Sequence, residues 1–196
     1  MRLLITGFEP FGSRNINISW EVAKAFEGKE NISVIQLPVS FSKAHKLVIE
    51  EMSKANYTSI IMLGETSVTS DFIRLERIAI NLKDAKSADN DGEIADEEPI
   101  CQGTPTAFLS NFPIKNLCNN LNKEDFKIKI SNSAGTFVCN CLYYNILKHI
   151  TENSLSTKAL FIHFPASEES IDKEKKIKTV DCIINILNRD ILKIAD

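Results

Sequence analysis

The feature that most constrains the fold of this chain is an alternation of short apolar runs with amphipathic runs. Short apolar runs are typical of buried strands, and an apolar residue every three or four positions is typical of helices. The strand-like runs are Arg2–Thr6, Ser33–Leu37, Ser59–Leu63, Ile73–Asn81, Phe126–Ile130 and Ala159–His163. The helix-like runs begin near Ser19, Ser42, Pro113 and Phe137, and a last one covers Ile171–Ile194. This order predicts an α/β sandwich around a mixed, largely parallel sheet, and we expect Ser19 and Ser42 to be N-caps.

Composition sets the class of protein. A chain of 196 residues fits one domain, residues 1–196, and 43% hydrophobic with 25% charged residues is ordinary for a soluble globular protein. The net charge of −3 argues against nucleic acid as a partner. No run approaches the roughly 18 apolar residues of a membrane-spanning helix, and the first apolar run is too short for a signal peptide. We therefore expect a cytoplasmic protein without a membrane partner.

The cysteines indicate free thiols. Their number is odd and no pair has the C-x₂-C spacing of a metal site, so a reducing compartment and no metal are expected. The five are Cys101, Cys118, Cys139, Cys141 and Cys182.

One cysteine lies where a nucleophile is expected. Between the strand-like run that ends at Ile130 and the helix-like run that begins near Phe137, the chain has small polar residues and a glycine, Ser131–Gly135. This places Cys139 in the first turn of a helix, where unpaired backbone N–H groups and the helix dipole stabilise a thiolate. A thiolate is the nucleophile of cysteine hydrolases. The alternative is a buried helix cysteine that packs as a small hydrophobe.

The three histidines differ in their surroundings. His163 closes a buried strand-like run that is followed by Pro165, and the carboxyl end of such a strand is the usual ligand-binding edge of an α/β sheet. His45 lies in a polar helix-like run, where we expect a solvated face. His149 ends the Cys139 helix, where a histidine complements the helix dipole. His163 is therefore the candidate base, with a hydrogen-bonded core histidine as the alternative.

A candidate acid interrupts the strand-like run Ile73–Asn81. Glu76 lies among apolar residues there, and a carboxylate in such a place needs hydrogen bonds or a counter-charge. A surface ion pair with Arg74 or Arg77 is one explanation. The functional interpretation is a carboxylate that orients an imidazole and stabilises its protonated form.

These segments belong to a set of six motifs that occur in order. The motifs are Thr6–Gly12, Asn17–Glu21, Leu37–Phe41, Glu76–Asn81, Ser131–Asn140 and Phe161–Pro165. Glu76 and Cys139 are 63 residues apart, and Cys139 and His163 are 24 residues apart. In these motifs and separations the chain resembles the pyroglutamyl peptidase I (pyrrolidone-carboxylate peptidase) family of cysteine peptidases. The resemblance runs from Leu3 to about Pro165.

The resemblance implies a fold and an activity. The fold is a three-layer α/β/α sandwich of the phosphorylase/hydrolase type, and family members are often homotetramers. The activity is removal of an N-terminal pyroglutamyl residue from peptides without a metal or cofactor. By resemblance Cys139 is the nucleophile that forms the acyl-enzyme, His163 the general base and acid, and Glu76 the orienting carboxylate.

The resemblance also implies a substrate site. Phe8, Phe11, Phe137 and Val138 would line a pocket for the flat lactam ring, and Asn17 would be a nearby polar positioning group. The chain departs from the family at two places. Gly64–Asp71 stands where the family usually has Gly-Gln and then Gly-Gly-Arg, and Lys86–Asn90 stands where it usually reads Arg-Ile-Pro-Asp-Asn. Lys86 would keep the charge that helps hold the oxyanion without the planar fork of arginine, and Ser87 would lose an apolar contact with the ring.

Three other functions share parts of this pattern with the peptidase. A glutamine-amidotransferase-like amidase also uses Cys, His and Glu, but it would need a Gly-x-Cys-x-Gly elbow, which Val138-Cys139-Asn140 does not supply. The two departures motivate a catalytically weakened relative that acts as a binding protein. A redox pair of Cys139 and Cys141 is disfavoured, because residues two apart on a helix point to different faces.

Overall fold

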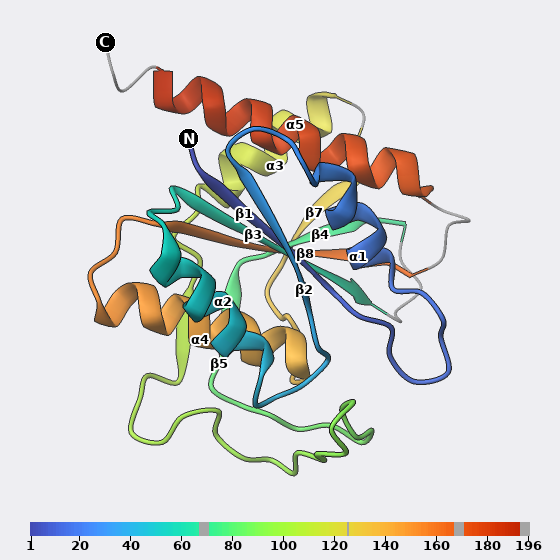
Figure 1. The fold of residues 1–196 in the computed structure, drawn as a ribbon, viewed down its shortest axis with the longest axis vertical. Coiled ribbons are helices and arrows are strands. Elements are labelled where there is room, and N and C mark those ends of the chain that lie inside the picture. Colours follow the sequence, from blue (N-terminus) through green and yellow to red (C-terminus); the bar gives the residue numbers. More distant parts are fainter. Residues whose placement is uncertain (67–70, 125, 167–170, 193–196) are drawn as a thin grey trace.

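The computed structural model describes residues 1–66, 71–124, 126–166 and 171–192, and these form helices on both faces of a six-stranded sheet (Figure 1). In spatial order the strands are β2 (Ile32–Leu37), β1 (Leu3–Phe8), β3 (Ser59–Thr66), β8 (Lys158–Pro165), β4 (Ile73–Glu76) and β7 (Ile128–Ser131). All neighbouring pairs are parallel except β8 and β4, which are antiparallel. The predicted α/β fold with a mixed, largely parallel sheet is therefore confirmed.

The helices divide into two layers (Figure 1). They are α1 (Ile18–Ala23), α2 (Ala44–Lys54), α3 (Ile114–Lys123), α4 (Val138–Glu152) and α5 (Lys173–Leu192), with a 3₁₀ turn, η1 (Lys24–Phe26), after α1. One apolar core joins α1, α3 and α5 to one face of the sheet, and a second joins α2 and α4 to the other. None of the helices within the described ranges is long and apolar enough to cross a membrane.

The central strands are buried on both faces, as their sequences predict. All six residues of β1 and seven of the eight residues of β8 are buried. Because helices cover both sides of the sheet, such strands read as continuous apolar runs rather than as alternating ones. A polar residue inside them, such as His163 in β8, is therefore held in a fixed position by its surroundings.

The structure corrects the prediction of one strand over Ile73–Asn81. The run is divided at Arg77 into β4 and β5 (Ile78–Ile80), and β5 pairs with β6 (Ala107–Leu109) in a separate two-stranded sheet. The Arg77 N–H still bonds to the Ser131 carbonyl, but its side chain is exposed and bonds to Asn132. Periodicity could not reveal the division, because both halves are apolar.

The two predicted N-caps are also wrong. Asn17 caps α1 and accepts a hydrogen bond from the Ser19 N–H, so Ser19 lies inside the helix. The residue at the N-cap of α2 is Lys43, without a side-chain cap bond, rather than Ser42. The start of the last helix was predicted near Ile171 and is found at Lys173, and the predicted end at Ile194 lies outside the described residues.

A long loop between β5 and β6 lies under α2 and α4 (Figure 1). Its part from Lys83 to Glu98 is rich in Asp and Glu, and it is irregular apart from one isolated bridge between these two residues. Asp89 anchors the loop, because its carboxylate accepts hydrogen bonds from the N–H groups of Phe41, Asp91 and Glu93. The loop is thus fixed against the segment after β2.

Candidate active site

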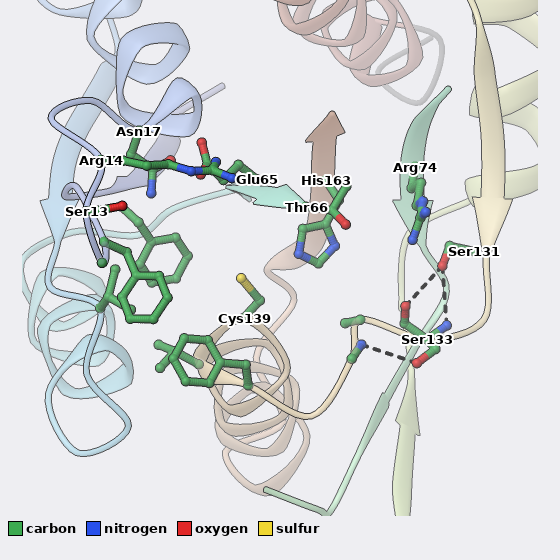
Figure 2. A pocket seen from close by; sticks show the side chains of 18 residues that line it. Ser13, Arg14, Asn17, Glu65, Thr66, Arg74, Ser131, Ser133, Cys139 and His163 are labelled. Carbon is green, nitrogen blue, oxygen red and sulfur yellow. Dashed lines mark hydrogen bonds and ion pairs between the residues drawn. The ribbon is translucent and has the colours of Figure 1, made fainter. Parts of the chain in front are cut away.

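A cavity of about 670 Å³ opens where the carboxyl ends of β1, β3 and β8 meet the N-terminus of α4. That volume is within the usual range for small-molecule sites. Figure 2 shows Cys139 and His163 facing one another at its centre. Residues that lie far apart in the chain therefore share one concave surface.

His163 and Glu76 meet through the antiparallel pairing of β8 with β4. In this register Arg74 lies opposite His163 and Glu76 lies opposite Phe161, so Glu76 is a diagonal neighbour of the histidine. The distance from Nδ1 of His163 to Oε1 of Glu76 is 2.9 Å. The glutamate is 0% exposed and the histidine 6%. Two charged groups buried this deeply are tolerable only as a pair.

Gly64 gives the imidazole its space. It lies opposite His163 in the parallel pairing of β3 with β8. A Cβ atom on Gly64 would come within 3.0 Å of His163 Cδ2 and 2.8 Å of Phe161 Cε1. Because these rings are buried, a larger residue at position 64 would displace the histidine.

Cys139 lies in the first turn of α4, as its sequence predicts. The turn before the helix contains Gly135, whose φ of +80° is a conformation that favours glycine. The N-cap residue, Phe137, makes no side-chain cap bond, so the first N–H groups of α4 have no partner of that kind. Cys139 belongs to this turn, and N–H groups at a helix N-terminus are suited to binding an anion.

Asn140 fixes the start of this helix. It is 0% exposed, and its Nδ2 donates to the carbonyls of Ile80 and Leu82 at 2.9 and 3.0 Å. Its Oδ1 accepts from the Ile80 N–H at 3.0 Å. The side chain next to Cys139 thus ties α4 to β5. No role is predicted for Asn140 above, although a polar side chain directly after a candidate nucleophile is visible in the sequence.

The electrostatics of the pair favour a charged imidazole. Burial by itself lowers the pKa of His163, but the charge of Cys139, side-chain hydrogen bonds with Cys139 and Glu76, and the charge of Glu76 together raise that pKa to about 9. These interactions favour the imidazolium form over the neutral ring. This arrangement suits a thiolate–imidazolium pair.

Three other thiols are in different surroundings. Cys141 is 3% exposed, and burial raises its pKa to about 12. Burial also raises the pKa values of Cys118 and Cys182. A raised pKa disfavours the thiolate that reacts with electrophiles. Cys139 is the cysteine that lines the cavity.

The remaining two histidines lie outside the cavity lining. His45 is half-buried rather than solvated, and burial lowers its pKa. His149 is in the last turn of α4, as predicted. Neither histidine therefore belongs to the surface that Cys139 and His163 share.

One end of the cavity is aromatic. Phe137 contacts Phe11 and Phe41, with ring centroids 5.2 Å apart in both pairs. Phe41 lies outside the cavity lining, and Phe8 and Val138, both buried, line the cavity with Phe11 and Phe137. The four apolar residues predicted to line the substrate pocket therefore lie together beside Cys139.

The rim next to the aromatic wall carries an ion pair that we had not predicted. Arg14 pairs with Oε1 of Glu65 (Figure 2). Oε2 of Glu65 accepts a hydrogen bond from the Ile18 N–H at 3.1 Å. Arg14 follows β1 in the chain, and Glu65 is the second-last residue of β3. These two strands are parallel neighbours in the sheet. The carboxyl ends of such strands meet at one edge, a signal that was available in the sequence. Asn17, the cap of α1, also lines the cavity and donates to the Glu9 carbonyl at 3.0 Å.

Lys86 is not brought to the cavity. It is exposed, as is Ser87, and neither belongs to the residues that line the cavity. The reason is the path of the loop. Asp84 is held by reciprocal hydrogen bonds with Thr136, and Ala85 is held by the Ala95 carbonyl, which leaves the next side chains facing solvent. The charge that the resemblance implied for the oxyanion is therefore absent from the lining.

The side chains that could hold a metal ion are scattered in the part of the chain that the structure describes. Within the described ranges, no group of three or more His, Cys, Asp and Glu side chains is placed to hold an ion.

Comparison with known proteins identifies the family. A family model for pyroglutamyl peptidase matches residues 1–194. The pyrrolidone-carboxylate peptidase of Thermococcus kodakarensis is 35% identical over 187 residues, which cover 93% of this chain and 90% of the relative. That of Thermoanaerobacter pseudethanolicus is 41% identical over 169 residues, 84% of this chain and 82% of the relative.

Solved structures agree with these relatives. The crystal structure of pyroglutamyl peptidase I from Bacillus amyloliquefaciens has a TM-score of 0.86 and 34% identity, covering 91% of this chain and 92% of that one. A mutant pyrrolidone carboxyl peptidase from Pyrococcus furiosus has a TM-score of 0.89 and 32% identity, covering 97% and 100%. The chain therefore belongs to the pyroglutamyl peptidase family and is a cysteine peptidase of the pyroglutamyl peptidase I type.

Proposed function

We propose that this protein hydrolyses the bond that follows an N-terminal pyroglutamyl residue, through a Cys139-His163-Glu76 triad and a thioester intermediate. The observation that carries the proposal is the buried His163–Glu76 pair facing Cys139 in a cavity with one aromatic end. Family membership supports the substrate class. The geometry supports the roles of the residues.

The first half of the reaction transfers the acyl group. The Cys139 thiolate attacks the pyroglutamyl carbonyl carbon, and the carbonyl oxygen takes the electron pair. Backbone N–H groups at the start of α4 would hold this oxyanion, a contact typically worth about 3 kcal/mol. The intermediate then collapses, the C–N bond breaks, and the Nε2 proton of His163 goes to the leaving amine. The pyroglutamyl group is left on the sulfur as a thioester.

The second half uses the same histidine as a base. Once the sulfur is acylated its charge is gone, and with it one of the interactions that raise the pKa of His163. Burial then lowers that pKa, and the neutral imidazole takes a proton from water. The hydroxyl attacks the thioester, the C–S bond breaks, and pyroglutamate leaves with the thiolate and imidazolium restored. The position of His163 between Cys139 and Glu76 thus suits both halves of the reaction.

The aromatic end of the cavity suits the acyl group. A pyroglutamyl ring is small, flat, uncharged and mostly apolar, and the rings of Phe8, Phe11 and Phe137, which line the cavity, offer it a wall of the same character. A free N-terminal amino group would be poorly solvated against such a wall. Selection of the blocked N-terminus follows from this difference.

The test is release of a fluorescent amine from a pyroglutamyl amide. Wild type should hydrolyse it, and Cys139→Ala should lose this activity. Cys141→Ser, which changes the buried cysteine two residues further along the same helix, should keep it. After a rapid acid quench, intact-mass measurement should show the pyroglutamyl adduct on the wild-type protein and no adduct on Cys139→Ala. Full activity in Cys139→Ala would refute the mechanism, and tight pyroglutamate binding without turnover in wild type would favour the binding-protein alternative.

A further inference from the structure

Arg74 places a cation in the cavity on the side away from the aromatic wall. It lies directly opposite His163 in the antiparallel pairing of β4 with β8, so both side chains project from the same face of the sheet. Both line the cavity. In Figure 2, Ser13, Arg14 and Asn17 lie on one side of Cys139 and His163, whereas Arg74, Ser131 and Ser133 lie on the other.

The other charges of the cavity are already matched. Arg14 pairs with Glu65, and His163 pairs with Glu76. Arg74 has no ion pair with any described carboxylate, and its Nε is buried without a hydrogen-bond partner among the described residues. A guanidinium has five donors in a planar fork, which match a carboxylate. Arg74 thus has the chemistry of a binding group for an anion that reaches it through the cavity.

The reaction itself decides which part of a substrate reaches Arg74. Under the proposed function, the acyl ring lies against the aromatic wall and its carbonyl lies at Cys139. The leaving amine must lie next to His163, which protonates it. The residue that carries this amine therefore extends past His163, toward Arg74 and the two serine hydroxyls.

We propose that Arg74 is a specificity-determining residue that selects peptides with a carboxylate on the first residue after the scissile bond. The inference rests on the proposed function and adds a preference for the leaving group. The carboxylate is either an Asp or Glu side chain or the free terminus of a pyroglutamyl dipeptide. Both place the same group within one residue of the leaving nitrogen.

The experiment compares kcat/KM for two nearly isosteric peptides, pyroglutamyl-glutamyl-alanine amide and pyroglutamyl-glutaminyl-alanine amide. We expect wild type to prefer the glutamyl peptide about tenfold at low salt, the effect typical of one charge-assisted contact. The preference should shrink as salt screens the charge. A second pair, pyroglutamyl-alanine and its amide, separates the two sources: a preference for the free acid assigns the site to the terminal carboxylate.

Two substitutions complete the test. Arg74→Gln should reduce the preference to under about twofold. Arg77→Gln, three residues further along the chain, changes an exposed arginine that does not line the cavity and should keep the preference. Because each preference is a ratio within one variant, a change in the folded fraction cancels. Equal kcat/KM values within both peptide pairs in wild type, or an unchanged preference in Arg74→Gln, would overturn the inference alone. No hydrolysis of any of these peptides would overturn the proposed function and this inference with it.

Discussion

Replacing Glu76 with glutamine should move the alkaline limit of activity to lower pH. The substitution keeps the size of the side chain and removes the charge that stabilises the imidazolium of His163. Glu76 contributes to this pKa both a hydrogen bond, at 2.9 Å, and its charge. A hydrogen bond to a charged group contributes about 1.5–3 kcal/mol, and about 1.4 kcal/mol corresponds to one pKa unit. The pKa of His163 should therefore fall by about one to two units from its value of about 9.

The assay is the pH dependence of kcat/KM on a pyroglutamyl amide. In wild type, activity should decline as pH rises through about 9, because the imidazolium that protonates the leaving amine is lost. In Glu76→Gln the decline should begin about one to two pH units lower. At neutral pH the variant should lose about tenfold to a hundredfold in kcat/KM, the rate equivalent of 1.5–3 kcal/mol.

Stability supplies an independent measurement of the same pKa. A histidine whose pKa is raised from 6.5 to about 9 by folding stabilises the protein fully below pH 6.5, and this contribution is lost as pH rises through about 9. The fall in unfolding free energy over that window should be smaller in Glu76→Gln. Tyr143→Phe is the matched control, because the Tyr143 hydroxyl donates to the Glu76 carbonyl rather than to its carboxylate. An alkaline limit that stays at the same pH in Glu76→Gln would refute the assignment of Glu76 as the group that holds the imidazolium.

Further predictions concern the nucleophile, the triad and the space around it. One equivalent of iodoacetamide near neutral pH should label Cys139 and abolish activity, and peptide mapping that finds Cys141 labelled first would contradict this, because burial raises the pKa of Cys141 to about 12. Cys139→Ala and His163→Ala should each lower kcat about as much as the double mutant, and additive losses would mean that the two do not share a step. Gly64→Ala should destabilise the protein by about 1–3 kcal/mol in urea unfolding and lower kcat, because the added Cβ would lie 3.0 Å from His163 Cδ2. A kcat equal to that of wild type would show that the imidazole tolerates the added methyl group. Lys86→Ala should have a kcat/KM within about twofold of the wild-type value, because the Lys86 side chain is exposed and does not line the cavity. A large loss of kcat/KM would instead support the oxyanion role implied by the resemblance.

Local pattern was sufficient to predict the chain order of the six strands of the main sheet and of the five helices, together with two positions of the site, but not β6 or the separation of β5 from β4. The apolar run Ala159–His163 predicts a buried strand, and β8 is buried along seven of its eight residues. The change from small polar residues to a helical period after Ser131–Gly135 predicts a helix start, and Cys139 lies in the first turn of α4. Both predictions succeed because burial and helix initiation depend on residues that are close in sequence.

Only the tertiary structure decided how those positions meet. The contact of Glu76 with His163 depends on β4 running antiparallel to β8, and the pairing of Arg14 with Glu65 depends on β1 lying beside β3. The loop that holds Lys86 away from the cavity is likewise fixed by bonds to distant residues. Side-chain alternation determines which face a residue takes, but strand order, direction and register follow from packing between segments far apart in the chain. For this reason Cys139, His163 and Glu76 could be named as candidates from the sequence, whereas the geometry that brings them together could not.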